Sequence, residues 1–181
     1  MLGQAAFAAE SVLTQSQAQE YLFDAARAGR SELVTDLLKA GTPIDATNAA
    51  GYSALILAAY SGRLDTVDTL LRAGANPDLG DGRGNTALMG AIFKGEEAVA
   101  LRLLADPRTT VDARNRAGQT AAMFAALFGR QRLIDELAAR GADLGAADAA
   151  GMTPLKLAQQ QGNAALAQRI GELAQTAVAS P

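Results

Sequence analysis

The amino-acid sequence predicts an all-α solenoid of about five stacked helix-turn-helix units. Two sets of glycines support this prediction, because each recurs every 33 or 34 residues: Gly29, Gly62, Gly95, Gly129 and Gly162, then Gly51, Gly84, Gly118 and Gly151. Hydrophobic residues make up 49% of the 181-residue chain, but aromatic residues only 4%, which suits closely packed helices with small side chains. A period of this length is typical of an array whose units become stable by stacking on one another.

Each unit is expected to begin with a short helix that follows a glycine of the second set. A serine or threonine stands two residues after each of these glycines, at Ser53, Thr86, Thr120 and Thr153. A hydroxyl at this position can cap a helix by accepting a backbone N–H. A glycine of the first set then ends the helix. Residues 15–28 are expected to form the first helix of the first unit.

The second helix of each unit is expected to bury one face. Mostly apolar residues stand four, five, eight and nine positions after each glycine of the first set, which is the spacing of one helical face. These faces are Leu33/Val34/Leu37/Leu38, Thr66/Val67/Leu70/Leu71, Val99/Ala100/Leu103/Leu104, Leu133/Ile134/Leu137/Ala138 and Leu166/Ala167/Ile170/Gly171.

Three fragments resemble the ankyrin repeat, a resemblance that extends over roughly residues 15–174. The segments YSALILAA (52–59) and MTPLKLA (152–158) are close to the family's T-P-L-H-x-A-A, and residues 62–76 follow its second helix and turn. The resemblance implies antiparallel helix pairs with finger-like turns on one side. The expected repeats are 15–47, 48–80, 81–114, 115–147 and 148–175, the outer two as caps, with 1–14 as a signal-peptide remnant or flexible N-terminus and 176–181 as a flexible tail.

The chain departs from the family pattern in two places. Ile56, Met89, Met123 and Lys156 replace the family's histidine, so its hydrogen bonds between repeats must be absent or remade. Segment 105–111 at the end of the third repeat is one residue longer than its equivalents and lacks their glycine. Pro107 in this segment cannot continue a helix. We interpret the segment as a tolerated loop insertion.

Aromatic residues gather at positions that vary from repeat to repeat and are therefore not fixed by stacking. The resemblance implies that such positions, on finger tips and the exposed face of first helices, line a concave binding side. The candidate partner-binding residues are Tyr52, Tyr60, Arg83, Asn85, Phe93, Lys94, Arg116, Gln119, Leu127 and Phe128. Aromatic and arginine side chains anchor many protein interfaces. The alternative is that the rings fill gaps between helices, and Phe124 is interpreted as core.

Other patterns are assigned to the scaffold. The glycine-rich segment 80–84 is interpreted as a finger turn, because no Lys-Ser/Thr of a phosphate-binding loop follows it. An Asn or Asp that can hold a turn stands three residues before each finger glycine, at Asn48, Asp81, Asn115 and Asp148. The acidic residues of the second helices, Asp65, Asp68, Asp135 and Glu136, are expected to form a solvated outer face.

Composition excludes several kinds of chemistry. The chain has no Cys and no His, which removes thiolate nucleophiles, Ser-His-Asp catalysis and the usual zinc sites. A net charge of −3 argues against nucleic acid as the main partner, and no apolar run reaches the ~18 residues of a membrane span. We therefore expect no metal, no cofactor and no membrane insertion. An enzyme built on carboxylates, Lys, Ser/Thr or Tyr is the competing hypothesis, although no such pair stands at a convincing spacing.

The sequence thus predicts a non-enzymatic module that binds a protein partner through its concave face. Residues 6–8 (Ala-Phe-Ala) match the small-x-small pattern of a signal-peptidase site, so we expect a periplasmic location and otherwise a cytoplasmic one. Exported bacterial ankyrin proteins that the chain resembles include some linked to a periplasmic catalase and oxidative-stress defence, and others that look like antidotes to secreted toxins. A monomer is expected, or a weak homodimer that uses the same face.

Overall fold

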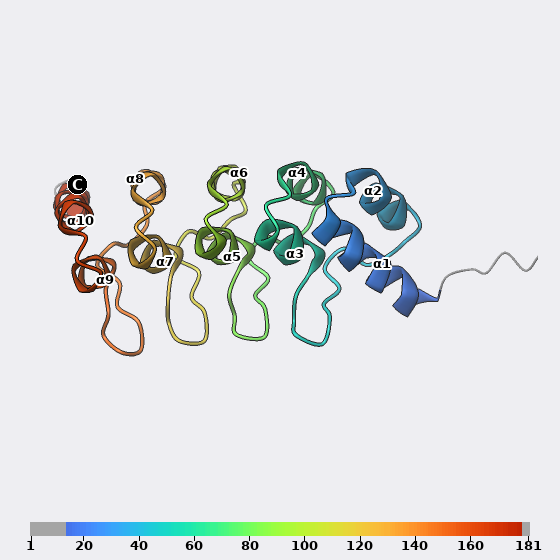
Figure 1. The fold of residues 1–181 in the computed structure, drawn as a ribbon, viewed down its shortest axis with the longest axis horizontal. Helices are drawn as coiled ribbons and strands as arrows, with labels where there is room; N and C mark the ends of the chain where they lie inside the picture. Colours follow the sequence, from blue (N-terminus) through green and yellow to red (C-terminus); the bar gives the residue numbers. More distant parts are fainter. Residues whose placement is uncertain (1–13, 179–181) are drawn as a thin grey trace, which may run out of the picture.

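A computed structural model describes residues 14–178, which form ten α-helices in five consecutive pairs (Figure 1). The pairs are α1 (Gln15–Ala28) with α2 (Ser31–Lys39), α3 (Ala54–Tyr60) with α4 (Leu64–Arg72), α5 (Ala87–Lys94) with α6 (Glu97–Ala105), α7 (Ala121–Leu127) with α8 (Gln131–Ala139), and α9 (Pro154–Gln160) with α10 (Ala164–Val178). The predicted all-α repeat solenoid is confirmed. Helix α10 continues to Val178, beyond the tail boundary expected after residue 175, and the motif at residues 6–8 lies outside the described residues.

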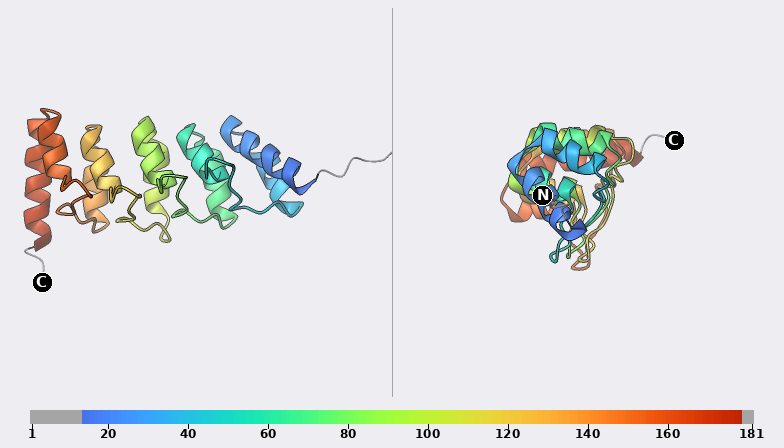
Figure 2. Two further views of the ribbon diagram at one scale, coloured as in Figure 1. Left: turned by 90° about the horizontal axis from the view of Figure 1, so that it is seen from below. Right: turned by 90° about the vertical axis from the view of Figure 1, so that its right-hand side faces the viewer.

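The helices form two rows, with the first helices of the repeats in one row and the second helices in the other (Figure 1). Each first helix packs on the first helix of the next repeat and on its own partner, and the second helices pack on one another in the same way. The loops between pairs project from one side as fingers, all in the same direction in the view along the array (Figure 2). This arrangement places a row of short helices beside a row of fingers.

The helix ends form where the hydroxyl residues and glycines predicted them. The side chains of Ser53, Thr86, Thr120 and Thr153 each accept a backbone N–H at 3.3–3.4 Å from the residue three positions later. The donors are the backbone groups of the residues that replace the family's histidine. Gly29 and Gly95 end α1 and α5 in the left-handed conformation, with φ of 80° and 79°, where a glycine has no steric cost.

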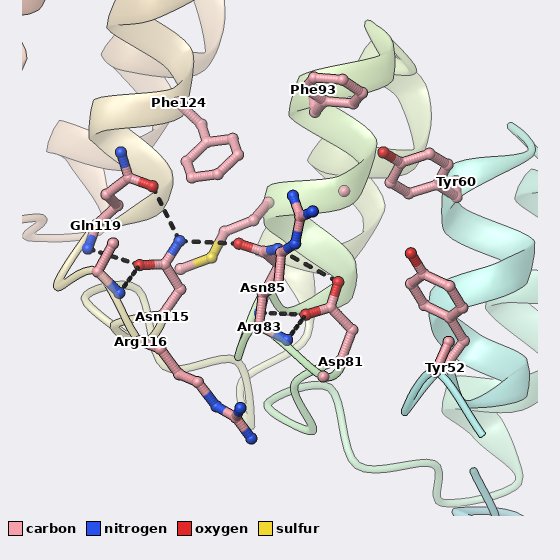
Figure 3. Close-up of a pocket in the computed structure, with 15 residues that line it drawn as sticks. Tyr52, Tyr60, Asp81, Arg83, Asn85, Phe93, Asn115, Arg116, Gln119 and Phe124 are labelled. Atoms are coloured by element: carbon pink, nitrogen blue, oxygen red, sulfur yellow. Dashed lines mark hydrogen bonds between the residues drawn. The ribbon is translucent and has the colours of Figure 1, made fainter. Parts of the chain in front are cut away.

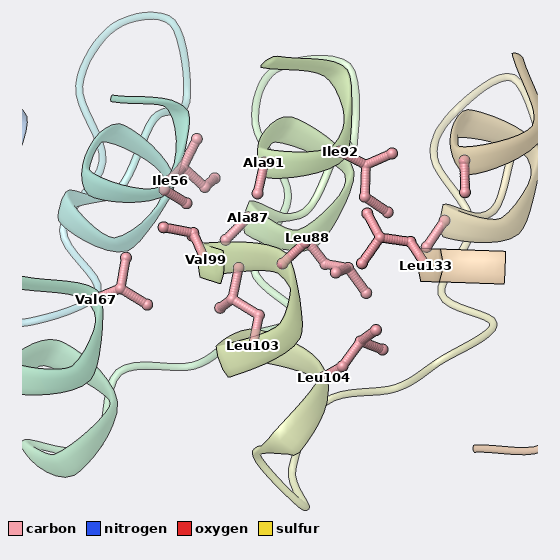
Figure 4. Close-up of a cluster of buried hydrophobic side chains, with 14 of the residues drawn as sticks. Ile56, Val67, Ala87, Leu88, Ala91, Ile92, Val99, Leu103, Leu104 and Leu133 are labelled. Atoms are coloured by element: carbon pink, nitrogen blue, oxygen red, sulfur yellow. The ribbon is translucent and has the colours of Figure 1, made fainter. Parts of the chain in front are cut away.

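The core is one continuous cluster of small and aliphatic side chains that runs through all five pairs. The predicted faces of the second helices are buried or half-buried throughout. Figure 4 shows Val67 of α4, Leu103 of α6 and Leu133 of α8 in this cluster. Thr66 is fully buried, and its hydroxyl lies 2.8 Å from the hydroxyl of Ser31 in the preceding repeat. Stacking therefore joins every repeat to its neighbours through side chains of the second helices.

Neighbouring fingers are joined by main-chain hydrogen bonds, which we call the finger ladder. The backbone N–H groups of Gly82, Arg116 and Ala149 each donate at 3.0 Å to a carbonyl of the preceding finger, namely those of Ala50, Arg83 and Ala117. Within each finger, the Asn or Asp side chain before the glycine accepts two backbone N–H groups, as predicted. The fingers are thus held in register by atoms that every residue type except proline carries.

The segment interpreted as a tolerated insertion has a structural role, which corrects that interpretation. The Arg108 side chain donates to both carboxylate oxygens of buried Asp106, at 2.9 and 2.8 Å. The same guanidinium donates to the carbonyls of Leu71 and Ala75 at 2.9 and 3.2 Å. Since a helix leaves its last carbonyls without internal partners, Arg108 satisfies the end of α4 and ties the third repeat to the second.

The outer face is also more than a solvated surface. Arg102 Nε lies 2.8 Å from Asp68 Oδ1, and Arg169 Nε lies 2.7 Å from Asp135 Oδ1. Both are ion pairs between second helices of adjacent repeats, so these two carboxylates also link neighbouring repeats across the outer face. Exposed pairs of this kind contribute little each, about 0–1 kcal/mol.

The Asp106–Arg108 pair predicts a loss of stability in acid. The hydrogen bond from the Arg108 side chain holds the pKa of Asp106 below its ordinary value of 3.8. The contribution of the carboxylate is therefore complete above about pH 4 and is lost as the pH falls through the lower folded-state pKa. We expect the difference in unfolding free energy between wild type and Asp106→Asn to be larger at pH 7 than at pH 3, as measured by urea unfolding.

The control for this experiment is Asp65→Asn, because Asp65 is exposed on α4 and has no ion-pair partner within residues 14–178. Its difference from wild type should stay small at both pH values. A difference for Asp106→Asn that does not change between pH 7 and pH 3 would show that its ionised form adds nothing to stability.

Candidate functional site

A groove of about 910 Å³ lies between the fingers and the first helices of the second, third and fourth repeats (Figure 3). Helices α3, α5 and α7 contribute one wall, with Tyr60, Phe93 and Phe124, and the fingers contribute the other. A second groove of about 680 Å³ adjoins it toward the first repeat and shares Tyr52 and Tyr60 with it. The finger side of the array therefore presents a hollow that extends over three repeats.

Seven of the ten predicted partner-binding residues line the first groove: Tyr52, Tyr60, Arg83, Asn85, Phe93, Arg116 and Gln119. Lys94 lines the adjoining groove, beside Tyr60. Phe128 lines neither groove, but its ring contacts Phe93. Leu127 is half-buried and packs against the core, so the structure does not bring it together with the others.

Four aromatic side chains form a continuous series of ring contacts, which we call the aromatic row: Tyr60, Phe93, Phe128 and Phe124. Tyr60 stacks on Phe93 with ring centroids 5.8 Å apart, and Phe93 meets Phe128 edge-on at 5.2 Å. Phe128 lies 6.3 Å from Phe124 in a tilted arrangement. Such contacts are the preferred geometries of aromatic pairs. The rings support one another, yet Phe93 keeps 44% of its surface exposed.

The row combines three different helix positions. Tyr60 and Phe93 stand at equivalent positions, 33 residues apart, whereas the equivalent position in α7 is Leu127. Phe128 is the next residue, at the C-cap of α7. Phe124, interpreted as core, is half-buried: it packs against the core and also lines the groove.

Gly90 admits the ring of Tyr60. A Cβ atom at this position would lie 2.9 Å from Tyr60 Cδ2, closer than real contacts allow. Gly90 is buried on the inner side of α5 and lines the groove. The absence of a side chain therefore lets the Tyr60 ring lie against the backbone of the next repeat.

Side-chain amides and a carboxylate form a chain along the finger wall (Figure 3). Asn115 Nδ2 donates to Asn85 Oδ1 at 2.8 Å and to Gln119 Oε1 at 3.0 Å, and Asn85 Nδ2 donates to Asp81 Oδ2 at 3.2 Å. Asn85, predicted as a partner contact, thus also joins its finger to the next one, and Gln119 accepts from Asn115 within its own finger. Sequence reasoning had assigned Asp81 and Asn115 to turns alone, although both line the groove.

Positively charged side chains lie beside the aromatic row. Burial raises the pKa of the Tyr60 hydroxyl above its ordinary value of 10.0, and Tyr52 and Asp81 act in the same direction. The Lys94 ammonium lies 5.5 Å from the centre of the Tyr60 ring, a cation–π contact. Arg83 and Arg116 are exposed on the finger tips. The groove therefore combines a neutral aromatic wall with cations at its margins.

Within residues 14–178, no cluster of three or more His, Cys, Asp or Glu side chains is placed to hold a metal ion. In that range, too, every helix is too short or too polar to cross a bilayer.

Comparison with known proteins gives one family match. The family model described as "Ankyrin repeats (3 copies)" matches residues 22–115, which include the first groove's wall from α3 and α5. No curated protein matches the chain.

Proposed function

The chain belongs to the ankyrin repeat family, whose members are in general protein–protein interaction modules, and we propose that it is a non-enzymatic module that binds a protein partner through the groove and the aromatic row. The binding surface would consist of the finger tips and the first helices of repeats two to four. The proposal keeps nine of the ten predicted residues and leaves out Leu127, which packs against the core.

The observation that carries the proposal is the exposure of Phe93 in the middle of the array. Its ring contacts Tyr60 and Phe128, yet 44% of its surface stays in water. A purely structural ring would be expected to bury itself more fully, because each Å² of apolar surface removed from water contributes about 25 cal/mol. A partner that covers the row would gain this contribution, together with ring contacts like those already present.

The polar wall supports a binding role over a catalytic one. Asp81, the carboxylate of the first groove, accepts two backbone N–H groups and the Asn85 amide of its own finger. A carboxylate whose oxygens are held in this way is poorly placed to accept a proton from a substrate. The amides beside it can still offer hydrogen bonds to a main chain laid along the groove.

The test is capture of a partner by the full chain and by Phe93→Ser. Tagged protein is incubated with an extract of the source cells, crosslinked, purified and analysed by mass spectrometry. Leu64→Ser is the matched control, because Leu64 is also an exposed apolar residue, at 39%, but lies on α4 in the second-helix row. We expect a protein that is captured by wild type and Leu64→Ser but lost with Phe93→Ser.

Equal capture by all three baits would contradict the proposed surface. Far-ultraviolet circular dichroism of each bait checks that the helices remain, so that loss of binding is not loss of fold.

We further propose that the protein acts in the periplasm and supports a catalase in oxidative-stress defence. The support is the resemblance to exported bacterial ankyrin proteins and the Ala-Phe-Ala motif at residues 6–8. A toxin as the captured partner would instead assign the antidote function, and a dimer in size-exclusion chromatography that Phe93→Ser dissolves would assign the groove to self-association. Detection of the native protein only in the cytoplasmic fraction would overturn the proposed location.

A further inference from the structure

We propose that the segment of partner seated on this surface is an acidic stretch of protein with an apolar residue between its carboxylates. The inference rests on the proposed function and specifies the chemistry of the partner. The whole chain carries a net charge of −3, whereas five cations and only two carboxylates line the two adjoining grooves. The cations are Arg27, Arg63, Arg83, Lys94 and Arg116, and the carboxylates are Asp81 and Glu96.

Four of these cations have no carboxylate partner within residues 14–178: Arg63, Arg83, Lys94 and Arg116. The cations of the outer face are used differently, since Arg102, Arg132 and Arg169 each form an ion pair with an acidic residue of the preceding repeat. Three cations of the second-helix row are thus paired with carboxylates, whereas these four cations that line the grooves are not.

The two lining carboxylates do not cancel this charge at the surface. Asp81 Oδ1 accepts the backbone N–H groups of Arg83 and Asn85 at 2.8 and 2.9 Å, and its Oδ2 accepts the Asn85 amide. The Glu96 carboxylate lies against Gly62 of the preceding repeat, where a Cβ atom would be 2.4 Å from Oε2. Both groups lie against the scaffold, whereas the Arg83 side chain extends from its finger toward the helix wall and that of Arg116 extends away from it (Figure 3).

The positions of the cations suggest a spacing for the partner's carboxylates. Arg83 lies on the finger that leads into α5, and Lys94 is the last residue of that helix. The eight residues of α5 span roughly 12 Å at 1.5 Å per residue. An extended peptide rises about 3.3 Å per residue, so acidic side chains about four positions apart reach both ends. Phe93 and Tyr60 lie at the Lys94 end of this span, so the apolar residue stands next to the carboxylate that meets Lys94.

An acidic protein segment fits this surface better than a nucleic acid. Phosphates would also meet the four unpaired cations, but the long negative backbone of a nucleic acid would be repelled by an acidic protein. The aromatic row offers an apolar contact that a peptide side chain can fill. Charge of this kind mainly guides encounter and selects between partners, whereas the rings provide the anchor.

The experiment measures binding of labelled peptide probes to the full chain by fluorescence polarisation at low salt. The probe is a twelve-residue peptide with Glu pairs flanking a central Phe, and the second peptide has Gln in place of each Glu. A twelve-nucleotide single-stranded DNA is the third probe. The proteins are wild type, Arg83→Gln/Arg116→Gln, and the control Lys39→Gln/Arg140→Gln, which removes the same charge from two exposed residues outside the grooves.

We expect the Glu peptide to bind the Arg83/Arg116 variant roughly tenfold more weakly than wild type, which corresponds to the loss of two charge contacts. The Lys39/Arg140 control should bind the Glu peptide as tightly as wild type does. The Gln peptide should bind wild type at least as weakly as the variant binds the Glu peptide. Equal binding of the Glu and Gln peptides, no saturable binding of the Glu peptide, or tighter binding of the DNA would each overturn the inference.

The inferred acidic partner and the proposed binding surface can fail independently of each other. If Phe93→Ser abolishes capture of the cellular partner while Arg83→Gln/Arg116→Gln captures it as wild type does, the groove is the binding site but its partner is not selected by acidic charge. If Phe93→Ser captures as wild type does, the proposed surface itself is wrong. Self-association of the wild type that excludes all three probes would assign the groove to a second copy and would also overturn the acidic segment.

Discussion

Replacing Leu103 by alanine is expected to lower the free energy of unfolding by about 2–5 kcal/mol, the range for a large aliphatic side chain removed from a packed core. Leu103 is fully buried on α6, the second helix of the middle repeat (Figure 4). Helix α6 packs against α4 on one side and α8 on the other. The cavity would therefore weaken the stacking of the central repeat, which no other part of the array can replace.

The matched control is Leu64→Ala, the same chemical change at a residue that is 39% exposed on α4. Its effect should stay within about 1 kcal/mol, because surface substitutions rarely exceed this size. Urea unfolding followed by circular dichroism measures both variants. Equal effects at the two sites would mean that the stacked face of α6 does not carry the stability assigned to it.

Leu103→Ala should also change the shape of the transition. In a linear array each repeat contacts only its neighbours, and cooperativity depends on the interfaces between them. A weakened central interface lets the two ends unfold separately, so the apparent m-value should fall as well as the midpoint. A lower midpoint at an unchanged m-value would instead indicate that the array still unfolds as one unit.

Gly51→Ala is expected to destabilise the protein more than Gly74→Ala does, although the two backbone conformations are alike. Both glycines have positive φ, 81° and 97°, so each substitution carries the cost of a left-handed alanine, about 1–2 kcal/mol. A Cβ atom at Gly51 would also lie 2.5 Å from the backbone nitrogen of Gly82, whereas nothing lies within 4 Å at Gly74. The clash falls on the N–H that binds Ala50 in the finger ladder.

The additional loss at Gly51 therefore measures one rung of the ladder. A broken and unsatisfied backbone hydrogen bond costs about 1–3 kcal/mol when it is shielded from water, so the expected difference lies at or below this range. Urea unfolding gives the total, and hydrogen exchange of the Gly82 amide should become faster in Gly51→Ala but not in Gly74→Ala. Equal losses and unchanged exchange would show that the fingers do not depend on this contact.

The repeat architecture could be read from the sequence because it depends on local rules that recur. Thr86 and Gly95 define the start and end of α5 through a side-chain cap and a left-handed backbone, and both act within one turn of their own position. The buried positions of the second helices follow from helical periodicity alone. Four units with the same two boundaries, and a first unit that shares the closing glycine, made the fold predictable without knowledge of any contact between them.

Contacts between side chains of different repeats were not predictable in this way. Arg108 reaches the end of α4 because the loop in the third repeat lies beside the second, and spacing along the chain does not encode this proximity. The pairing of Arg102 with Asp68 has the same origin. Phe124 was assigned to the core because its helix position is apolar in most repeats, yet its ring also contacts Phe128 and lines the groove.

The candidate site was predictable in its composition and less so in its internal geometry. Variation from repeat to repeat selected residues that the fold gathers around one groove, including Tyr60 and Phe93. It did not distinguish Phe128, which contacts the row, from Leu127, which packs against the core. The two residues are adjacent at the end of α7, and the directions of their side chains depend on the backbone conformation of the C-cap. Whether these residues contact a partner stays a prediction that Phe93→Ser tests.

The finger ladder fixes the spacing of the fingers without using the side chains at their tips. Its rungs are peptide groups, so the side chains of Ala50, Arg83, Arg116 and Ala117 hold none of the spacing between fingers. Tip residues of this kind can be exchanged for others without moving the neighbouring tips. The same scaffold is therefore suited to the grafting of new specificities, by natural drift or in the laboratory, with the stacked helices left as they are.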